Sequence, residues 1–211
     1  MGQITGMQPS QDFYSAYALR LLGGRNSTQF LRNYGWWIVT ISKQSRAYIQ
    51  ASENLHGLTD GLVVSIDPSI GSNSSMPGWA VYRASKYVES GTFKMNPRDS
   101  VPDRLRTLHN YVRKLYIQYP PDVLVYEEIP SMRQGGGNAE AHASLLKALG
   151  AILSVPGPDG YVGIMPISWK KMVREDYIKG DERDAVEIGH IVIELAHEIR
   201  YNQKRKGKSD E

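Results

Sequence analysis

The chain has 211 residues, of which 41% are hydrophobic, a composition ordinary for a globular protein with one core and a smaller additional segment. It has no cysteine, which excludes disulfides, thiolate metal sites and a cysteine nucleophile. The formal net charge of +3 and the sequence pI of about 9.0 permit a nucleic acid partner without requiring one. The sequence has neither a run of roughly 18 apolar residues nor a signal-peptide pattern, so we expect no membrane partner and no export.

Residues 1–60 differ in character from the rest, and we predict that they form a mainly helical N-terminal extension. Helix-like stretches at 11–22 and 42–55 flank the β-prone run WWIVTI, and HGLTDG reads as a turn-rich junction. Two interpretations are open. The extension is either a small DNA-binding module of the helix-turn-helix kind or an elaboration packed against the main domain. We favour the second because the segment carries no specific motif.

From Gly61 onward the pattern becomes regular and predicts a mixed sheet. β-Prone or buried runs indicate five strands, at 61–67, 78–84, 87–93, 120–128 and 161–167. The short turns between the first three strands predict an antiparallel meander.

Helices are predicted between and after the later strands. Apolar residues recur every three or four positions over 102–119 and 139–155, SWKK opens a short helix, and a long helix covers 181–201. The resulting order predicts an α/β domain over 61–202 with a five-stranded sheet flanked by helices. A charged, mobile tail is expected at 203–211.

Two of the predicted strands end in carboxylates. Asp67 ends the first strand, and Glu127 ends the fourth. If these strands are parallel neighbours, both acids lie at the carboxyl edge of the sheet, where open α/β sheets hold their sites. An aspartate before a proline also caps turns, so Asp67 alone is open to a purely structural interpretation.

The last predicted helix adds two acids in its first turn. Asp181 and Asp184 are three residues apart, so they share one helical face, although Asp181 alone is also explained as a cap. Four carboxylates in one place repel strongly, and a hard divalent cation such as Mg²⁺ or Mn²⁺ would compensate. Two ions about 4 Å apart can activate a water and stabilise a leaving oxygen in phosphodiester hydrolysis.

The ordered set of motifs SIDPS, GWAVY, ESGTF, DRLRTLHNYVRKL, VLVYEE, SLLKALGAI, SWKK and DERDAVEI resembles the RuvC-type Holliday junction resolvases over roughly residues 61–200. The tryptophan before the lysines and the N-terminal segment are more similar to the phage-type branch. The resemblance implies an RNase H-like fold and a Mg²⁺-dependent endodeoxyribonuclease that resolves four-way junctions by paired symmetric nicks. It also implies two ions per site, with Mn²⁺ as a substitute, a homodimer on branched DNA, and the cytoplasm of a bacterium or of a phage host.

Carried over position by position, the resemblance assigns site roles to particular residues. The metal ligands are Asp67, Glu127, Asp181 and Asp184. Lys170 is the active-site lysine, which holds a phosphate or stabilises developing charge. These five residues are the predicted catalytic set. DNA contacts are expected from Met132, Arg133, Gln134, Lys170 and Lys171, although either lysine is also explained as a solvated helix start.

The loop after Glu127 departs from the family pattern. Its sequence IPSMRQGGGN lacks the aromatic wedge that family members often carry, and Pro130 or Met132 could supply apolar surface instead. The cut-site preference is therefore open. Two other functions also remain: a nuclease of the same fold acting on flaps, branched DNA or RNA–DNA hybrids, and a non-catalytic DNA-binding module. Paired nicks predict a homodimer, with the apolar stripes over 102–119 and 139–155 as candidate interfaces or as core.

Overall fold

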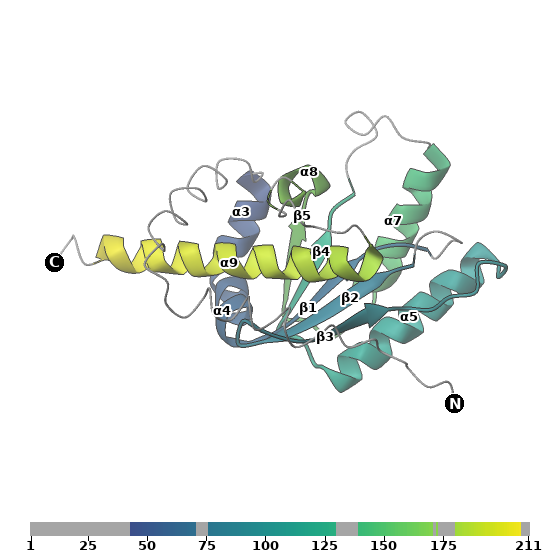
Figure 1. The fold of residues 1–211 in the computed structure, drawn as a ribbon, viewed down its shortest axis with the longest axis horizontal. Helices are drawn as coiled ribbons and strands as arrows, with labels where there is room; N and C mark the ends of the chain where they lie inside the picture. The colour runs from purple at the N-terminus through teal and green to yellow at the C-terminus, as the bar shows by residue number, and fades with distance from the viewer. Residues whose placement is uncertain (1–42, 71–75, 130–138, 171, 173–179, 208–211) are drawn as a thin grey trace. The chain divides into compact units, whose positions relative to one another are not determined.

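The computed structural model describes residues 43–70, 76–129, 139–170, 172 and 180–207, and these residues build one five-stranded sheet with helices on both faces (Figure 1). The strands are β1 (Leu62–Asp67), β2 (Gly78–Arg83), β3 (Lys86–Thr92), β4 (Val123–Glu127) and β5 (Gly160–Ile164). Their order across the sheet is β3-β2-β1-β4-β5. The first three strands pair antiparallel, and β4 and β5 run parallel to β1. The predicted mixed five-stranded sheet flanked by helices is confirmed.

The position of each strand in the sheet follows from its composition. β1 lies at the centre, and its residues from Leu62 to Ile66 are all buried, as expected for a strand covered on both faces. The one polar residue in that run, Ser65, donates from Oγ to the carbonyl oxygen of Ala185 at 2.7 Å. β3 lies at an edge, where its charged and half-exposed side chains discourage pairing with another chain.

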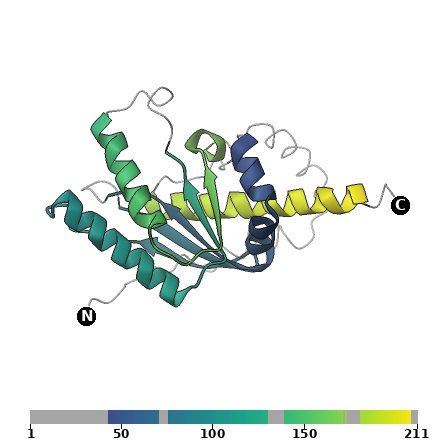
Figure 2. The same cartoon turned by 180° about the vertical axis from the view of Figure 1, so that it is seen from behind.

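One face of the sheet is covered by α5 (Val101–Gln118) and α7 (Ala139–Leu153), which lie in front in Figure 2. Both begin and end within two residues of the predicted bounds. The side chain of Ser100 caps α5 by accepting from the backbone N–H of Asp103 at 3.3 Å, and Pro102 occupies the first turn, as predicted.

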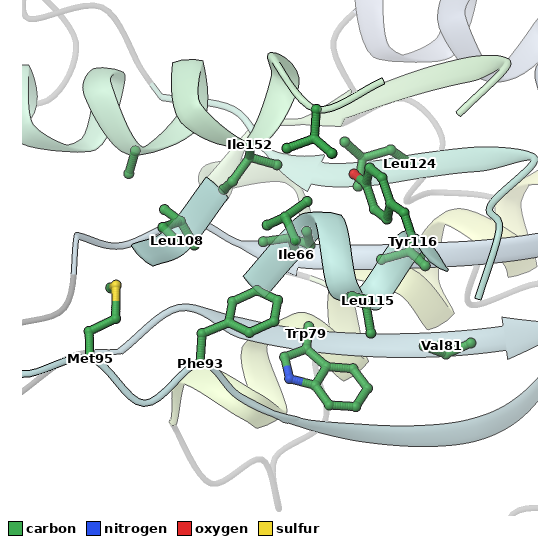
Figure 3. Packing of buried hydrophobic residues seen from close by; sticks show 14 of the residues in the cluster. Ile66, Trp79, Val81, Phe93, Met95, Leu108, Leu115, Tyr116, Leu124 and Ile152 are labelled. Atoms are coloured by element: carbon green, nitrogen blue, oxygen red, sulfur yellow. The ribbon is translucent and has the colours of Figure 1, made fainter. Parts of the chain in front are cut away.

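The main hydrophobic core lies between these two helices and the sheet (Figure 3). Leu108 and Leu115 of α5 and Ile152 of α7 pack there with Ile66 and Leu124 of the strands. The apolar stripe of α5 is therefore core and is not a surface for a second copy. The apolar face of the sheet must be shielded from water, and the side chains of this stripe provide the apolar area that covers it.

The opposite face is covered by α9 (Asp181–Gly207), which contacts β1, β2, β3 and β4 and crosses the front of the sheet in Figure 1. This helix runs further than the predicted 181–201. Residues 203–207 of the predicted mobile tail are helical, because lysine, arginine and glutamine are good helix formers and no breaker precedes Gly207. In the described residues, no helix has the length and apolar character needed to cross a membrane.

The described part of the N-terminal segment forms two helices, α3 (Lys43–Gln50) and α4 (Ser52–Asp60). Both contact β5 and α9, and they belong to the compact unit that runs from Ile41 to Glu211. The predicted turn at HGLTDG is wrong, since α4 includes its first five residues and ends at Asp60. Gly57 permits this packing: a Cβ at that position would lie 2.4 Å from Cγ2 of Val123 in β4. The rest of the predicted extension lies outside the described residues.

Candidate active site

The carboxyl edge of the sheet brings the two strand-end acids together. β1 and β4 are parallel neighbours with Ile66 opposite Tyr126, so the next residues, Asp67 and Glu127, end their strands side by side. Within the alternation of β1, Ile66 faces the core of α5 and α7, while Ser65 faces α9. Asp67 therefore follows the strand pattern onto the face that α9 covers.

The first turn of α9 lies against the same edge. Asp181 accepts a hydrogen bond on Oδ2 from the backbone N–H of Met76 at 2.7 Å, just before β2. Gly78, which pairs with Asp67 across β1 and β2, permits this contact, because a Cβ there would lie 1.8 Å from the carbonyl oxygen of Asp181. The absence of a side chain at Gly78 thus sets how closely the helix approaches the strand that carries Asp67.

Asp184 is buried beneath that first turn. Its exposed fraction is 6%, and its Oδ1 accepts from the backbone N–H of Gly180 at 3.3 Å. Burial raises the pKa of Asp184, and the hydrogen bond from Gly180 and the nearby charge of Lys170 oppose that rise. A carboxylate buried at the start of a helix is compatible with the positive end of the helix dipole.

Glu127 is held on both of its carboxylate oxygens by consecutive residues. The indole Nε1 of Trp169 donates to Oε2 at 2.9 Å, and Nζ of Lys170 lies 3.7 Å from Oε1. Both residues come from the short helix α8 (Pro166–Trp169) and the position after it. The helix begins two residues before the predicted SWKK start, because Pro166 suits a first turn.

The electrostatics of this edge centre on Asp67. Burial, followed by the charges of Glu127, Asp184 and Asp181, raises the pKa of Asp67 to about 8, while Lys170 acts in the opposite direction. Burial likewise raises the pKa of Glu127, against the lowering effects of Lys170 and Trp169. The charges of all three other predicted ligands therefore act on Asp67. Together, the negative charges of the four acids exceed the single positive charge of Lys170.

This donor set fits a hard divalent cation. Its four candidate ligands offer only carboxylate oxygens, which Mg²⁺ and Mn²⁺ prefer, and a bound cation would relieve the repulsion that raises the pKa of Asp67. Three of these acids already accept hydrogen bonds from Met76, Gly180 and Trp169. In this arrangement, no group of three or more acids or histidines among the described residues is disposed to hold an ion.

Two further acids near the edge point elsewhere. Glu128 packs against Gly163 of β5, and its pKa is raised by burial. Glu182 accepts a hydrogen bond from the hydroxyl of Ser90 in β3 at 2.6 Å. Four of the predicted DNA contacts lie outside the described residues: Met132, Arg133, Gln134 and Lys171.

The hydrogen bond from Trp169 to Glu127 is not among the features predicted from the sequence, where the tryptophan only marks a similarity to one branch of the family. A signal was available, because a tryptophan in a short apolar turn beside the predicted lysine needs a partner for its N–H when it is buried.

The chain matches no known protein-family model. Over 100 residues, or 46% of the chain, it is 31% identical to the crossover junction endodeoxyribonuclease RuvC of Rickettsia typhi and 32% identical to that of Rickettsia akari. The chain spans 59% of the length of each of these curated relatives. The predicted resemblance to RuvC is confirmed by this similarity.

Two solved structures are also similar. Thermus thermophilus RuvC in complex with Holliday junction substrate aligns with a TM-score of 0.48 and 20% identity, over 68% of this chain and 96% of that one. The yeast mitochondrial Holliday junction resolvase Ydc2 aligns with a TM-score of 0.49 and 11% identity, over 74% of this chain and 92% of that one.

Proposed function

We propose that the chain is a divalent-metal-dependent endodeoxyribonuclease that resolves four-way DNA junctions by paired nicks. The observation that carries this proposal is the accumulation of acidic charge around Asp67, from Glu127, Asp181 and Asp184, with Lys170 beside it. The similarity to RuvC supports the choice of substrate, because those relatives are named crossover junction endodeoxyribonucleases.

The four acids would hold two Mg²⁺ ions, and Mn²⁺ would substitute, since both ions prefer oxygen ligands. When bound, such ions activate a water and stabilise the leaving oxygen of a phosphodiester. The chain itself supplies orientation. Glu127 is held by Trp169 and Lys170, and Asp181 is held by the backbone of the segment before β2. Carboxylates on a rigid sheet edge and a helix start can be positioned more reproducibly than carboxylates on loops.

We propose that Lys170 contacts the substrate phosphate. Its side chain is 48% exposed, whereas the side chain of Glu127, 3.7 Å away, is only 16% exposed. An approaching phosphate would compete with Glu127 for the ammonium and would gain a cation at the scissile position. We propose Met132, Arg133, Gln134 and Lys171 as further DNA contacts on the sequence argument alone.

Paired nicks need two active sites, so we propose that the functional unit is a homodimer. The outer surfaces of α5 and α7 offer apolar side chains for such an interface. Ile117 is 73% exposed, and Leu146 is 49% exposed with Leu145 beside it. These residues are distinct from the stripes that form the core.

Cleavage of a substrate panel tests the proposal. We expect symmetric nicks in a four-way junction in Mg²⁺, none in EDTA, and weaker cleavage of a flap, an RNA–DNA hybrid and a plain duplex. Stronger cleavage of the flap or the hybrid would assign the site to another nuclease of this fold. Tight junction binding without cleavage in Mg²⁺ or in Mn²⁺ would indicate a non-catalytic binding module.

A further inference from the structure

Trp169 links the two oppositely charged groups of the candidate active site. It is the last residue of α8, and its side chain is fully buried. Its indole N–H donates to Oε2 of Glu127 at 2.9 Å, and its ring lies 5.0 Å from Nζ of Lys170. One side chain therefore contacts both the carboxylate and the ammonium.

The backbone holds Trp169 in a defined place relative to Glu127. Glu127 pairs directly with Ile164, the last residue of β5, and α8 begins two residues later. Within this turn, the backbone N–H groups of Trp169 and Lys170 donate to the carbonyl oxygens of Met165 and Pro166, at 3.3 and 3.0 Å. Hydrogen-bonded backbone thus connects β4 through β5 to the turn that carries Trp169.

The contact restrains the carboxylate of Glu127 at both oxygens. A single partner would leave it free to rotate about its last bond, whereas Trp169 and Lys170 bind different oxygens. The ring adds a cation–π attraction that keeps the ammonium of Lys170 near Oε1. Any buried acceptor would satisfy the N–H of a tryptophan that only filled the core, whereas this N–H ends on a carboxylate of the candidate site.

We propose that Trp169 is a positioning residue, which fixes the carboxylate of Glu127 and the ammonium of Lys170 relative to each other. This role rests on the proposed function, in which Glu127 binds a metal ion and Lys170 binds a phosphate. Hydrogen bonds to ligating groups are worth about 10- to 100-fold in metal affinity or activity. Trp169 should therefore affect metal binding as well as cleavage.

The test measures Mn²⁺ affinity by calorimetry, in the absence of DNA, for the full-length chain and for variants at this position. Trp169→Phe removes the N–H and part of the ring. Replacement of Trp169 by 3-benzothienylalanine removes the N–H and keeps the shape. The matched control is Trp79→Phe, a buried tryptophan of the hydrophobic core. We expect both changes at 169 to weaken Mn²⁺ binding by about 10- to 100-fold and the control to leave it unchanged.

The outcomes separate this role from the proposed function. Parent-like Mn²⁺ affinity in the benzothienyl variant overturns the role of Trp169, whether or not Trp169→Phe folds. Equal losses in Trp169→Phe and Trp79→Phe, with none in the benzothienyl variant, assign Trp169 to packing and also overturn it. A parent chain that binds no Mn²⁺ overturns the metal-dependent function itself.

Discussion

Two aspartates at the opposite ends of β1 have opposite electrostatic environments. Asp60 lies just before the strand, and its pKa is lowered, chiefly by the hydrogen bond from Arg200 at 2.6 Å. Asp67 ends the strand, and burial with three neighbouring carboxylates raises its pKa to about 8. The protein therefore balances the charge of Asp60 with a cation of its own and surrounds Asp67 with like charges.

The carboxylate of Asp60 has hydrogen-bonding and charged partners from the protein itself. His56 and Thr59 of the same helix contact its carboxylate at 3.0 and 3.2 Å, and Arg200 joins it from α9. This cluster connects α4 to α9 at the surface. By contrast, no ion pair to Asp67 is present within the described part of the chain. The difference favours a structural role at one end of the strand and a cation site at the other.

The largest effect should come from Asp67→Asn, which keeps the size of the side chain and removes its charge. We expect junction cleavage in Mg²⁺ to fall by more than the roughly 100-fold that the loss of a hydrogen bond to a metal ligand costs. Junction affinity in EDTA should stay unchanged or rise slightly, because one repulsive charge is removed and the basic residues are intact. A cleavage time course beside a gel-shift titration measures both quantities.

The control for that experiment is Asp60→Asn at the other end of β1. It should cleave at close to the parental rate. Near-parental cleavage by Asp67→Asn would mean that Asp67 is not a metal ligand. Loss of both cleavage and binding would show instead that Asp67 holds the turn after β1.

Gly78→Ala should have the next largest effect. The added Cβ would overlap backbone atoms of Asp181. Backbone atoms cannot move aside as the end of a flexible side chain can. We expect a loss of about 1–3 kcal/mol in the free energy of unfolding, and weaker Mn²⁺ binding as α9 moves from the edge. Denaturant unfolding and calorimetry measure the two effects.

Gly150→Ala is the matched control, because a Cβ at that position meets nothing within 4 Å. Equal stability of the two variants would contradict the close approach of α9.

The dependence of stability on pH should have opposite signs for the two aspartates. Between the ordinary pKa of 3.8 and about 8, the unfolded chain has lost the Asp67 proton while the folded chain keeps it. This group therefore makes the free energy of unfolding fall as pH rises through that range. Asp67→Asn removes this pH-dependent loss of stability. The melting temperature of the variant minus that of the parent, both measured in EDTA, should therefore increase from pH 5 to pH 8.

Asp60 contributes in the other direction. Its folded pKa is lowered, so its contribution to stability is present above 3.8 and is lost as pH falls through the folded pKa. Asp60→Asn should therefore melt below the parent at both pH 5 and pH 8. Adding Mg²⁺ at pH 8 should raise the melting temperature of the parent and of Asp60→Asn, but not that of Asp67→Asn. A Mg²⁺ response in all three chains would place the cation elsewhere.

The smallest effect should come from Arg200→Gln. This change removes the partly exposed ion pair between Arg200 and Asp60, just before β1. We therefore expect the melting temperature to fall by about 2–4 °C at most. Mn²⁺ affinity and cleavage should not change. A loss of metal affinity in this variant would show that the two ends of the strand are coupled through α9.

Local sequence was enough to predict most of the fold and the acids of the candidate site. Strong apolar periodicity marked α5 and α7 to within two residues, and five β-prone runs marked the strands. Asp67 and Glu127 could be paired in advance, because parallel neighbours bring their carboxyl ends to one edge. The acids of α9 followed from their place in the first turn of an amphipathic helix.

Tertiary structure decided what local sequence could not. HGLTDG has the composition of a turn, yet it is helical because Gly57 lets α4 pack closely on β4, and such packing overrides weak propensity. Two contacts join segments more than forty residues apart: the hydrogen bond of Trp169 with Glu127, and the approach of Gly78 to Asp181. No local sequence pattern encodes such contacts. The sequence by itself determined which groups carry charge. Only the folded chain determined which of those charges are balanced, because burial and distance set the pKa of each.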